Sequence, residues 1–243
     1  MSPTPTTVLI TGGSRGIGLG LVTKFLAQPN HTVIALNRSP SPTLDLLPRA
    51  PGSTLITLQY DASIPSSATN AIAALQEKGV SHLDIVIANA AILTGYPLVK
   101  DATREGLMEH YLVNVVGPLE LYQAARGLLE KGERPRFAIV GSGAGSFARQ
   151  PPIPHAYYGG SKAVLPWYAI RLHAEDEWLS SFVIDPGWVK TEMGNTGAAF
   201  FGLKEAFGEV EDAVNGIYNV TTTATREKFG GKLVQFDGKI LDY

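Results

Sequence analysis

The sequence predicts a doubly wound α/β fold in which helices cover both faces of a single parallel sheet. Seven short apolar runs occur along the chain, and segments with helical spacing or loop composition separate most of them. Strands that are buried on both faces have such uninterrupted runs, and helical connections between them give parallel pairing. Because 243 residues suffice for one domain of the usual size, we expect a three-layer αβα sandwich of the Rossmann type with a seven-stranded sheet.

The composition excludes several functional classes. The net charge of −2 gives no reason to expect nucleic acid or an anionic membrane as a partner. The chain has no cysteine, which excludes disulfides, zinc–thiolate sites and thiol catalysis. Its first residues, MSPTPTT, lack the basic and apolar regions of a signal peptide, and no apolar run approaches the roughly 20 residues that span a bilayer. We therefore expect a cytoplasmic protein.

The first strand, turn and helix, within Thr6–Gly20, form an expected phosphate-binding element. The apolar run Val8–Ile10 precedes a glycine-rich turn, after which apolar residues recur at helical spacing. Glycines allow the backbone to approach a pyrophosphate closely, and the start of the helix offers unpaired N–H groups and the positive end of its dipole. An ordinary tight turn is the alternative, but a tight turn alone does not require three glycines at the specific spacing Gly12-x-x-x-Gly16-x-Gly18.

The second strand, Thr32–Asn37, ends without the carboxylate that dinucleotide-binding folds use to bind the ribose 2′-hydroxyl of NAD. Arg38 follows the strand, and the next acid is Asp45. A carboxylate would repel a 2′-phosphate, whereas a guanidinium binds one well. The missing acid, together with Arg38 and the turn residue Arg15, favours NADP(H); the alternative is that both arginines are ordinary surface residues.

The segments that follow alternate between loop, strand and helix patterns. Ser39–Gly52 is rich in proline and serine and is expected to be a surface loop. Thr54–Gln59 and Leu83–Ala88 are apolar runs and are predicted to be the third and fourth strands. A helix is predicted between them over Pro65–Lys78, and Asp61 is a candidate for its N-cap.

A long helical pattern over Arg104–Glu130 contains Asn114 among apolar positions. A polar side chain there costs free energy unless it is hydrogen-bonded, so Asn114 has either a structural partner or a functional one. Arg136–Gly141 is predicted to be the fifth strand, and Ser142 follows it directly. Ser146 lies further into the same loop and is the rival candidate for a functional serine.

The segment after this loop places a tyrosine and a lysine on one helical face. Phe147–Ala156 contains three prolines and is expected to shape the entrance of a substrate cleft. Tyr158 and Lys162 are four residues apart and therefore share a face, whereas Tyr157 lies about 100° around the helix from Tyr158. Pro166 lacks the N–H that would bond to the preceding turn, so we expect a kink there.

The last third of the chain predicts two strands, a lid and a helix. Leu179–Ile184 is an apolar run, and a proline–glycine loop, Asp185–Thr191, follows it. The region 188–208 carries several phenylalanines and is expected to be a mobile lid. Glu209–Arg226 has helical spacing, and Leu233–Phe236 is predicted to be the seventh strand.

These motifs together resemble the short-chain dehydrogenase/reductase family over nearly the whole chain. The turn TGGSRGIG, the sequence Val-Asn-Val-Val-Gly, the Gly-Ser after the fifth strand, the Tyr-x-x-x-Lys pair and the proline–glycine loop all match it. Ala-Asn-Ala-Ala, residues 88–91, departs from the family's Asn-Asn-Ala-Gly at two positions. The Tyr-Gly-x-Ser-Lys variant and the Thr-Arg-Glu-Lys to Phe-Asp-Gly tail are similar to those of norsolorinic acid ketoreductases and C-factor-type carbonyl reductases within the family.

The resemblance implies strand order 3-2-1-4-5-6-7 and hydride transfer between NADP(H) and a carbonyl carbon. It makes Tyr158 the general acid and Ser142 a hydrogen-bond donor to the carbonyl oxygen. Lys162 would lower the pKa of the tyrosine and bind the ribose, and Asn114 would hold a water of the proton relay. Substrate would contact Ser142, Tyr158 and Trp188. The expected cofactor-binding residues are Gly12, Ser14, Arg15, Gly16, Ile17, Gly18, Asn37, Arg38, Asp61, Asn89, Tyr158, Lys162, Pro186, Gly187, Val189 and Thr191.

Three other classes compete with this interpretation. A serine hydrolase is suggested by Gly159-Gly160-Ser161, but no histidine follows His173, so the order required after a nucleophile elbow fails. A metal enzyme is disfavoured because the histidines occur without ligand spacing. A catalytically silent NADP(H)-binding sensor or scaffold stays open, although such proteins typically lose the tyrosine or the lysine. We expect no metal, no nucleic-acid or membrane partner, and a homodimer or homotetramer.

The residues expected around the nicotinamide site predict a bulky, largely apolar carbonyl substrate, aromatic or polyketide-like. Small polar metabolites need several fixed hydrogen-bonding groups, which these segments do not offer. The competing explanation is that the same side chains pack the lid onto the sheet. They are Ile92, Leu93, Phe147, Ile153, Tyr157, Trp188, Met193, Phe200 and Phe201.

Overall fold

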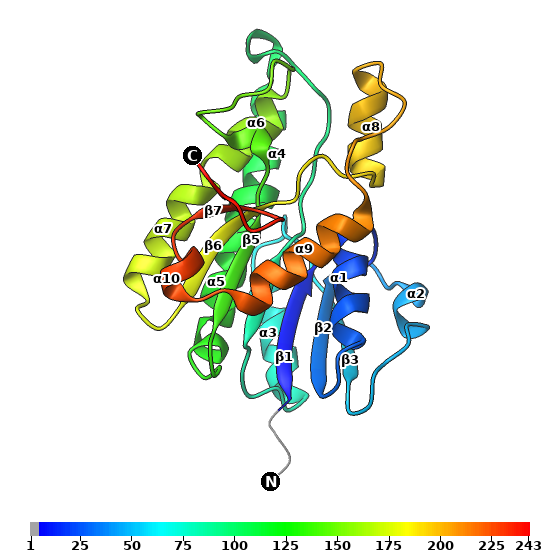
Figure 1. Ribbon diagram of the computed structural model, residues 1–243, viewed down its shortest axis with the longest axis vertical. Helices are drawn as coiled ribbons and strands as arrows, with labels where there is room; N and C mark the ends of the chain where they lie inside the picture. The colour runs from blue at the N-terminus through cyan, green and yellow to red at the C-terminus, as the bar shows by residue number, and fades with distance from the viewer. Residues whose placement is uncertain (1–4) are drawn as a thin grey trace.

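The computed structural model describes residues 5–243 and contains one eight-stranded sheet with helices on both faces (Figure 1). The strand order, β3-β2-β1-β4-β5-β6-β7-β8, confirms the predicted order of the first seven strands. These seven pair in parallel. The strands are β1 Thr6–Thr11, β2 His31–Asn37, β3 Thr54–Gln59, β4 Ile85–Ala88, β5 Arg136–Val140, β6 Ser180–Asp185, β7 Leu233–Gln235 and β8 Ile240–Leu241.

The eighth strand was not predicted. β8 is two residues long and pairs antiparallel with β7 through a tight turn in which Gly238 has a positive φ of 89°. The backbone N–H of Gln235 donates to the carbonyl of Lys239 at 2.8 Å across this turn. A two-residue strand has no recognisable apolar periodicity, so the sequence signal was absent.

Helices pack on both faces of the sheet, and the sheet divides the hydrophobic core into two layers. Leu9 points into the layer beneath α3, α5 and α7, while its neighbours Val8 and Ile10 point into the layer beneath α1 and α9. This alternation is the pleat of a strand buried on both sides. The helices are α1 Gly16–Leu26, α2 Pro42–Asp45, α3 Ser67–Glu77, α4 Arg104–Tyr111, α5 Gly117–Leu129, α6 Ala156–Ala163, α7 Leu165–Glu175, α8 Glu192–Phe200, α9 Val210–Thr223 and α10 Arg226–Phe229.

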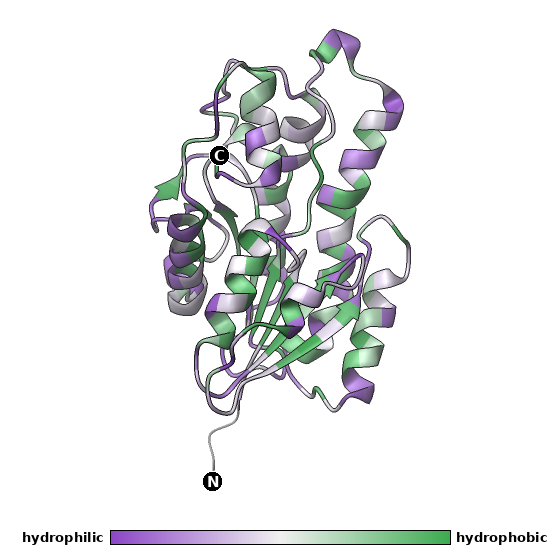
Figure 2. Cartoon of the chain, turned by 90° about the vertical axis from the view of Figure 1, so that its right-hand side faces the viewer, coloured by the Kyte–Doolittle hydropathy of each residue, from purple (hydrophilic) through white to green (hydrophobic). Residues whose placement is uncertain are grey.

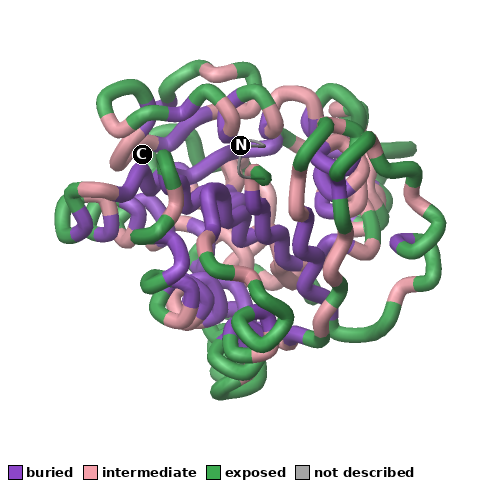
Figure 3. The backbone as a smooth tube through the Cα atoms, turned by 90° about the horizontal axis from the view of Figure 1, so that it is seen from below, coloured by how far each residue is buried: buried purple, intermediate pink, exposed green. Residues whose placement is uncertain are grey.

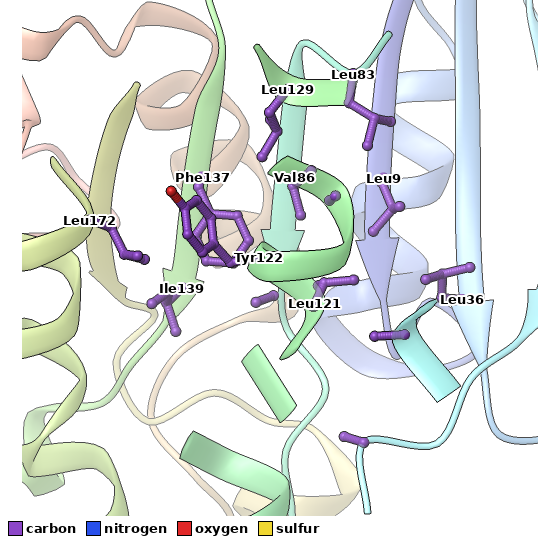
Figure 4. Packing of buried hydrophobic residues seen from close by; sticks show 14 of the residues in the cluster. Leu9, Leu36, Leu83, Val86, Leu121, Tyr122, Leu129, Phe137, Ile139 and Leu172 are labelled. Carbon is purple, nitrogen blue, oxygen red and sulfur yellow. The ribbon is translucent and has the colours of Figure 1, made fainter. Parts of the chain in front are cut away.

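The strands form the apolar centre of the molecule. They are green in the hydropathy view, whereas the helices present purple residues on their outer sides (Figure 2). The burial view shows the same arrangement, with exposed residues on outer turns and loops (Figure 3). In one layer, Tyr122 of α5 packs edge-on against Phe137 of β5 with ring centroids 5.4 Å apart, close to Val86 and Leu121 (Figure 4).

The predicted long helix Arg104–Glu130 is two helices joined by a π-helical turn at Leu112–Val116. Pro118 stands in the first turn of α5, where its missing N–H is tolerated. Because Pro118 also cannot donate to the carbonyl four residues earlier, it deprives Asn114 of the usual helical donor. The π-helical turn therefore lies at Asn114, which is the candidate site residue of this segment.

Two further expectations changed. The kink predicted at Pro166 is a break, because α6 ends at Ala163 and α7 begins with Pro166 in its first turn. Asp61 is not the N-cap of α3, which starts after Ser66; its Oδ1 instead accepts from the backbone N–H and the hydroxyl of Ser63. Within residues 5–243, no helix is both long enough and apolar enough to cross a bilayer.

Candidate active site

A cleft of about 1150 Å³ lies at the carboxyl ends of the parallel strands. Open α/β sheets bind their ligands at this edge, where the strand order reverses between β1 and β4. Every predicted cofactor-binding and substrate-binding residue lines the cleft. Asn114 does not line the cleft, because it is fully buried. Of the apolar residues expected around the nicotinamide site, Phe147, Tyr157 and Phe200 do not line it either, because Phe147 and Phe200 are exposed and the Tyr157 hydroxyl binds Thr103.

The glycine-rich turn has the geometry of an anion cradle. Gly12 and Gly16 have positive φ angles of 68° and 55°, and a Cβ atom on Gly18 would collide with the carbonyl oxygen of Gly12. Helix α1 starts at Gly16, and no side chain caps its first turn. The free N–H groups of that turn therefore point toward the cleft, as a bound pyrophosphate requires.

Asn89 supports this turn from the neighbouring strand. Its side-chain amide donates to the carbonyl of Thr11 at 2.9 Å, and its backbone N–H donates to the Thr11 hydroxyl at 3.0 Å. The amide also reaches the carbonyl of Gly12 at 3.3 Å. The Asn89 side chain therefore holds the glycine turn and also lines the cleft.

The two candidate arginines differ in their contacts. Arg15 Nη1 lies 2.6 Å from Glu192 Oε2 at the start of α8, and both side chains are exposed. Arg38 has no ion pair within 4.0 Å among residues 5–243, although its charge helps to hold the pKa of Asp61 below the usual range after the hydrogen bonds from Ser63. Asn37 is buried at the end of β2, and its Oδ1 has no hydrogen-bond partner in the described chain.

Ser142, Tyr158 and Lys162 meet at the end of β5. Ser142 follows this strand, and its hydroxyl accepts from the backbone N–H of Ala144 at 3.1 Å. Tyr158 and Lys162 lie one turn apart on α6, with the lysine Nζ 5.5 Å from the centroid of the tyrosine ring. Lys162 Nζ donates to the carbonyl of Val140, the last residue of β5, at 2.8 Å.

Desolvation dominates the titration of both groups. It raises the pKa of Tyr158 to about 12, and the hydrogen bond with Ser142 acts in the opposite direction. Desolvation also lowers the pKa of Lys162 to about 7, because burial disfavours the charged amine. The charge that was expected to lower the tyrosine pKa is thus partly removed by the burial of the lysine itself.

Asn114 joins the loop after β4 to helix α6. Its Oδ1 accepts from the backbone N–H of Ile92 at 2.8 Å, and its Nδ2 donates to the Ile92 carbonyl and to the Ser161 hydroxyl, both at 3.0 Å. Ser161 in turn donates to the carbonyl of Tyr158 at 2.8 Å. With its side chain engaged in this way, Asn114 has its main-chain carbonyl, rather than its amide, to offer to a water.

Comparison with known proteins agrees with this geometry. The family model described as short chain dehydrogenase matches residues 6–199. The chain belongs to the short-chain dehydrogenase family. It is 38% identical to short-chain dehydrogenase RED3 of Pyricularia oryzae, over 98% of each chain, and 38% identical to norsolorinic acid ketoreductase nor1 of Dothistroma septosporum, over 98% of this chain and 92% of that protein. The resemblance to the norsolorinic acid ketoreductases is thereby confirmed.

Solved structures show the same fold. The NADPH-bound carbonyl reductase from chicken fatty liver superposes with a TM-score of 0.84, at 25% identity, and the match covers 99% of this chain and all of that one. The carbonyl reductase Sniffer of D. melanogaster has a TM-score of 0.86 at 22% identity, over 98% of this chain and all of that one. The Rossmann-type α/β fold expected from the sequence is confirmed.

In this short-chain dehydrogenase, the segment 188–208, which includes helix α8 at the upper right of Figure 1, contributes Trp188 and Phe201 to the lining of the cleft. Its two ends are joined, because the N–H of Lys190 donates to the carbonyl of Gly208 at 2.8 Å and the Lys190 amine pairs with Glu205 and Glu209. Thr191 caps α8 by accepting from the N–H of Gly194 at 3.1 Å. Thr191 was expected to bind the cofactor, and in the structure its hydroxyl also caps the first turn of α8.

An aromatic cluster connects this segment to the opposite wall. Tyr96, in the loop after β4, stacks on Phe200 with centroids 4.5 Å apart and meets Phe201 edge-on at 5.2 Å. The ring of Trp188 meets those of Phe201 and Phe207 edge-on, with ring centroids 6.4 Å and 5.4 Å apart. The sequence predicts that residues 92–100 line one wall of a substrate cleft, and Tyr96 within this range does so, although it was not singled out by name.

Other residues weighed from the sequence have structural roles. Tyr157 turns away from Lys162, as expected, and its hydroxyl accepts from the backbone N–H of Thr103 at 3.0 Å. His110 is fully buried and binds the backbone at Gly106 and Thr94. Among residues 5–243, no group of three or more potential ligands is placed to hold a metal ion. The hydroxyl of Ser161 is buried and hydrogen-bonded, which leaves the hydrolase alternative without a nucleophile.

One charged pair at the cleft was not anticipated. Asp185, the last residue of β6, is buried, and one of its oxygens lies 4.0 Å from Arg149 in the proline-containing loop. Both residues line the cleft. Nothing in the sequence joins them, because they lie in segments whose relative placement depends on the tertiary fold.

Proposed function

We propose that this chain is an NADPH-dependent reductase that converts a ketone or aldehyde to the alcohol. The observation that carries the proposal is the meeting of Ser142, Tyr158 and Lys162 at the end of β5, in the same cleft that the glycine-rich turn opens. Membership of an oxidoreductase family and relatives named ketoreductases support it.

The residues present fit a nicotinamide dinucleotide. The cradle formed by Gly12, Gly16 and Gly18 leaves room for a pyrophosphate and no room for a side chain at Gly18. Arg38 is free of ion pairs in the described chain, and Asn37 stands where an NAD-preferring fold has a carboxylate. We therefore assign NADP(H), with Arg38 and Arg15 holding the 2′-phosphate; Arg15 would have to exchange its contact with Glu192 for the phosphate. When bound, the nicotinamide supplies the hydride.

The side chains of this chain handle the proton and the carbonyl oxygen. Tyr158 gives its phenolic proton to the oxygen as general acid. Ser142 donates a hydrogen bond to the same oxygen as negative charge develops on it. Lys162 binds the ribose and, when protonated, places positive charge beside the phenol. The Asn114 carbonyl holds a water through which the proton is replaced. The reverse oxidation uses the same groups.

A bulky aromatic or polyketide-like carbonyl compound is the substrate class we favour. Tyr96, Phe201, Trp188 and Ile153 line the cleft beside Tyr158 and give it an apolar wall. Relatives named norsolorinic acid ketoreductase support this class. We also propose that the protein is a homodimer or homotetramer and that it is cytoplasmic. Exposed apolar side chains on α4 and α7 support the oligomeric state, among them Leu107, Met108, Tyr111 and Trp167.

The test is a screen of NADPH consumption against a panel of ketones, aromatic ones included. Tyr158→Phe should lower kcat by about 10²–10⁴-fold and leave NADPH binding unchanged, because it removes a positioned general acid. Tyr157→Phe is the matched control, since that phenol binds Thr103 and should leave kcat unaltered. Wild-type kcat in Tyr158→Phe would contradict the assignment and favour a silent NADP(H)-binding sensor or scaffold.

A further inference from the structure

A buried carboxylate lies beside the reacting groups, although the proposed reaction places negative charge there. Val140 of β5 pairs with Ile184 of β6, so Ser142, just after the end of β5, and Asp185, the last residue of β6, lie at the ends of adjacent strands. One Asp185 oxygen accepts from the N–H of Gly187 at 3.0 Å, and the other packs so closely on Gly143 that a Cβ there would lie 3.0 Å away. The carboxylate is therefore fixed under the loop that carries Ser142.

The position of Asp185 opposes the chemistry. As hydride adds to the carbonyl carbon, the oxygen takes the electron pair of the C=O bond and then the Tyr158 proton, which leaves negative charge on the phenol oxygen. A fixed carboxylate on the neighbouring strand disfavours both charges. Consistent with this, the charge of Asp185 contributes to the raised pKa of Tyr158.

Arg149 is the ion-pair partner of Asp185 in the described chain, with Nη2 4.0 Å from Oδ2. The backbone holds this arginine in place from two sides. Its N–H donates to the buried hydroxyl of Ser146 at 3.1 Å, and the preceding residue, Ala148, donates to the carbonyl of Tyr243 at 2.9 Å. The strand β8 that the sequence did not predict thus brings the C-terminal residues against the loop that carries Arg149.

We propose that Arg149 is a positioning residue that neutralises Asp185, so that negative charge can develop on Tyr158 and on the substrate oxygen. The inference rests on the proposed function. It also assigns a purpose to the proline-containing loop, which carries the guanidinium from outside the sheet to a carboxylate at its edge.

The other charged and titratable groups near Tyr158 do not replace Arg149. Lys162 donates to Val140, and its burial leaves it only partly charged at neutral pH. Tyr96 acts in the same direction as Asp185 on the tyrosine. The remaining groups on this side of the cleft or on the same helix are Glu109, His155 and Tyr157.

A double-mutant cycle tests the proposal. In the cofactor-free protein, tyrosinate absorbance is titrated and the Tyr158 contribution is isolated by subtraction of Tyr158→Phe. Arg149→Gln should raise the Tyr158 titration midpoint by about one pH unit and lower kcat for reduction about tenfold. Arg149→Lys, which keeps the charge, should restore most of both. Asp185→Asn should lower the midpoint, and Arg149→Gln added to it should have no further effect.

Arg171→Gln is the matched control, because Arg171 is as exposed as Arg149 and pairs with Glu175 on the surface of α7. It should alter neither the midpoint nor kcat. The proposal is overturned if Arg149→Gln has the same effect with and without Asp185, if it changes only KM, or if it changes nothing. Absence of any wild-type ketone reduction would instead refute the proposed function, while the titration would still decide the role of Arg149.

Discussion

Lys162 is expected to destabilise the fold that it serves. Only 4% of its surface is exposed, and burial lowers its pKa from 10.5 to about 7. Between these two values the unfolded chain binds a proton that the folded chain does not, so the free energy of unfolding rises with pH over this window. At pH 7 the burial of this lysine lowers the free energy of unfolding by about 4 kcal/mol, because each unit of pKa shift corresponds to about 1.36 kcal/mol. The hydrogen bond to Val140 returns about 1 kcal/mol.

Lys162→Met should therefore raise the free energy of unfolding by about 3 kcal/mol at pH 7 while it abolishes reduction. At pH 9 the advantage should shrink to about 1 kcal/mol, because pH 9 lies closer to the unfolded-state pKa of 10.5 and removing the proton on folding then costs about 2 kcal/mol instead of about 4. Urea denaturation of both proteins at the two pH values measures this. Lys131→Met, at an exposed lysine, is the control and should show no such dependence on pH.

The reasoning is refuted if Lys162→Met is no more stable than the wild type at pH 7. It is also refuted if the difference between the two proteins is the same at pH 7 and pH 9. In either case the amine would be charged in the folded protein, and Lys162 would carry its full charge beside Tyr158.

Two further predictions concern the cofactor and the lid. Arg38→Ala should weaken NADPH binding by about one to two powers of ten, the loss of one charge-assisted contact, with NADH affinity as the internal control; equal wild-type affinity for both cofactors would exclude the proposed role. Phe201→Ala should raise KM for large aromatic ketones about 3- to 10-fold with little change in Tm, whereas Phe200→Ala, whose ring does not line the cleft, should raise KM less. A loss of about 3–5 kcal/mol of stability in Phe201→Ala would instead mark that ring as core packing.

The sheet and the cleft-lining motifs were predictable because local sequence determines both. A parallel sheet buried on two faces requires an uninterrupted apolar run such as Val8–Ile10, and the turn after it requires glycine at Gly12 and Gly16, whose φ angles are positive. Helical spacing placed Tyr158 and Lys162 on one face, and the motifs that precede them in the sequence singled out this pair. The π-helical turn at Leu112–Val116 did not follow, because apolar residues continue through it and mask the change of period.

The contacts that hold the site were not predictable for a different reason. Arg15 meets Glu192, and Arg149 meets Asp185, each across loops that only the assembled sheet brings together. Charges in loops carry no periodicity, so their partners depend on where the chain returns to the same edge. A motif identifies the groups that would meet a ligand, whereas part of the free energy that fixes those groups comes from residues outside the motifs. The buried amine of Lys162 is the clearest instance, because a backbone carbonyl at the end of β5 holds its position, and no side-chain motif specifies that contact.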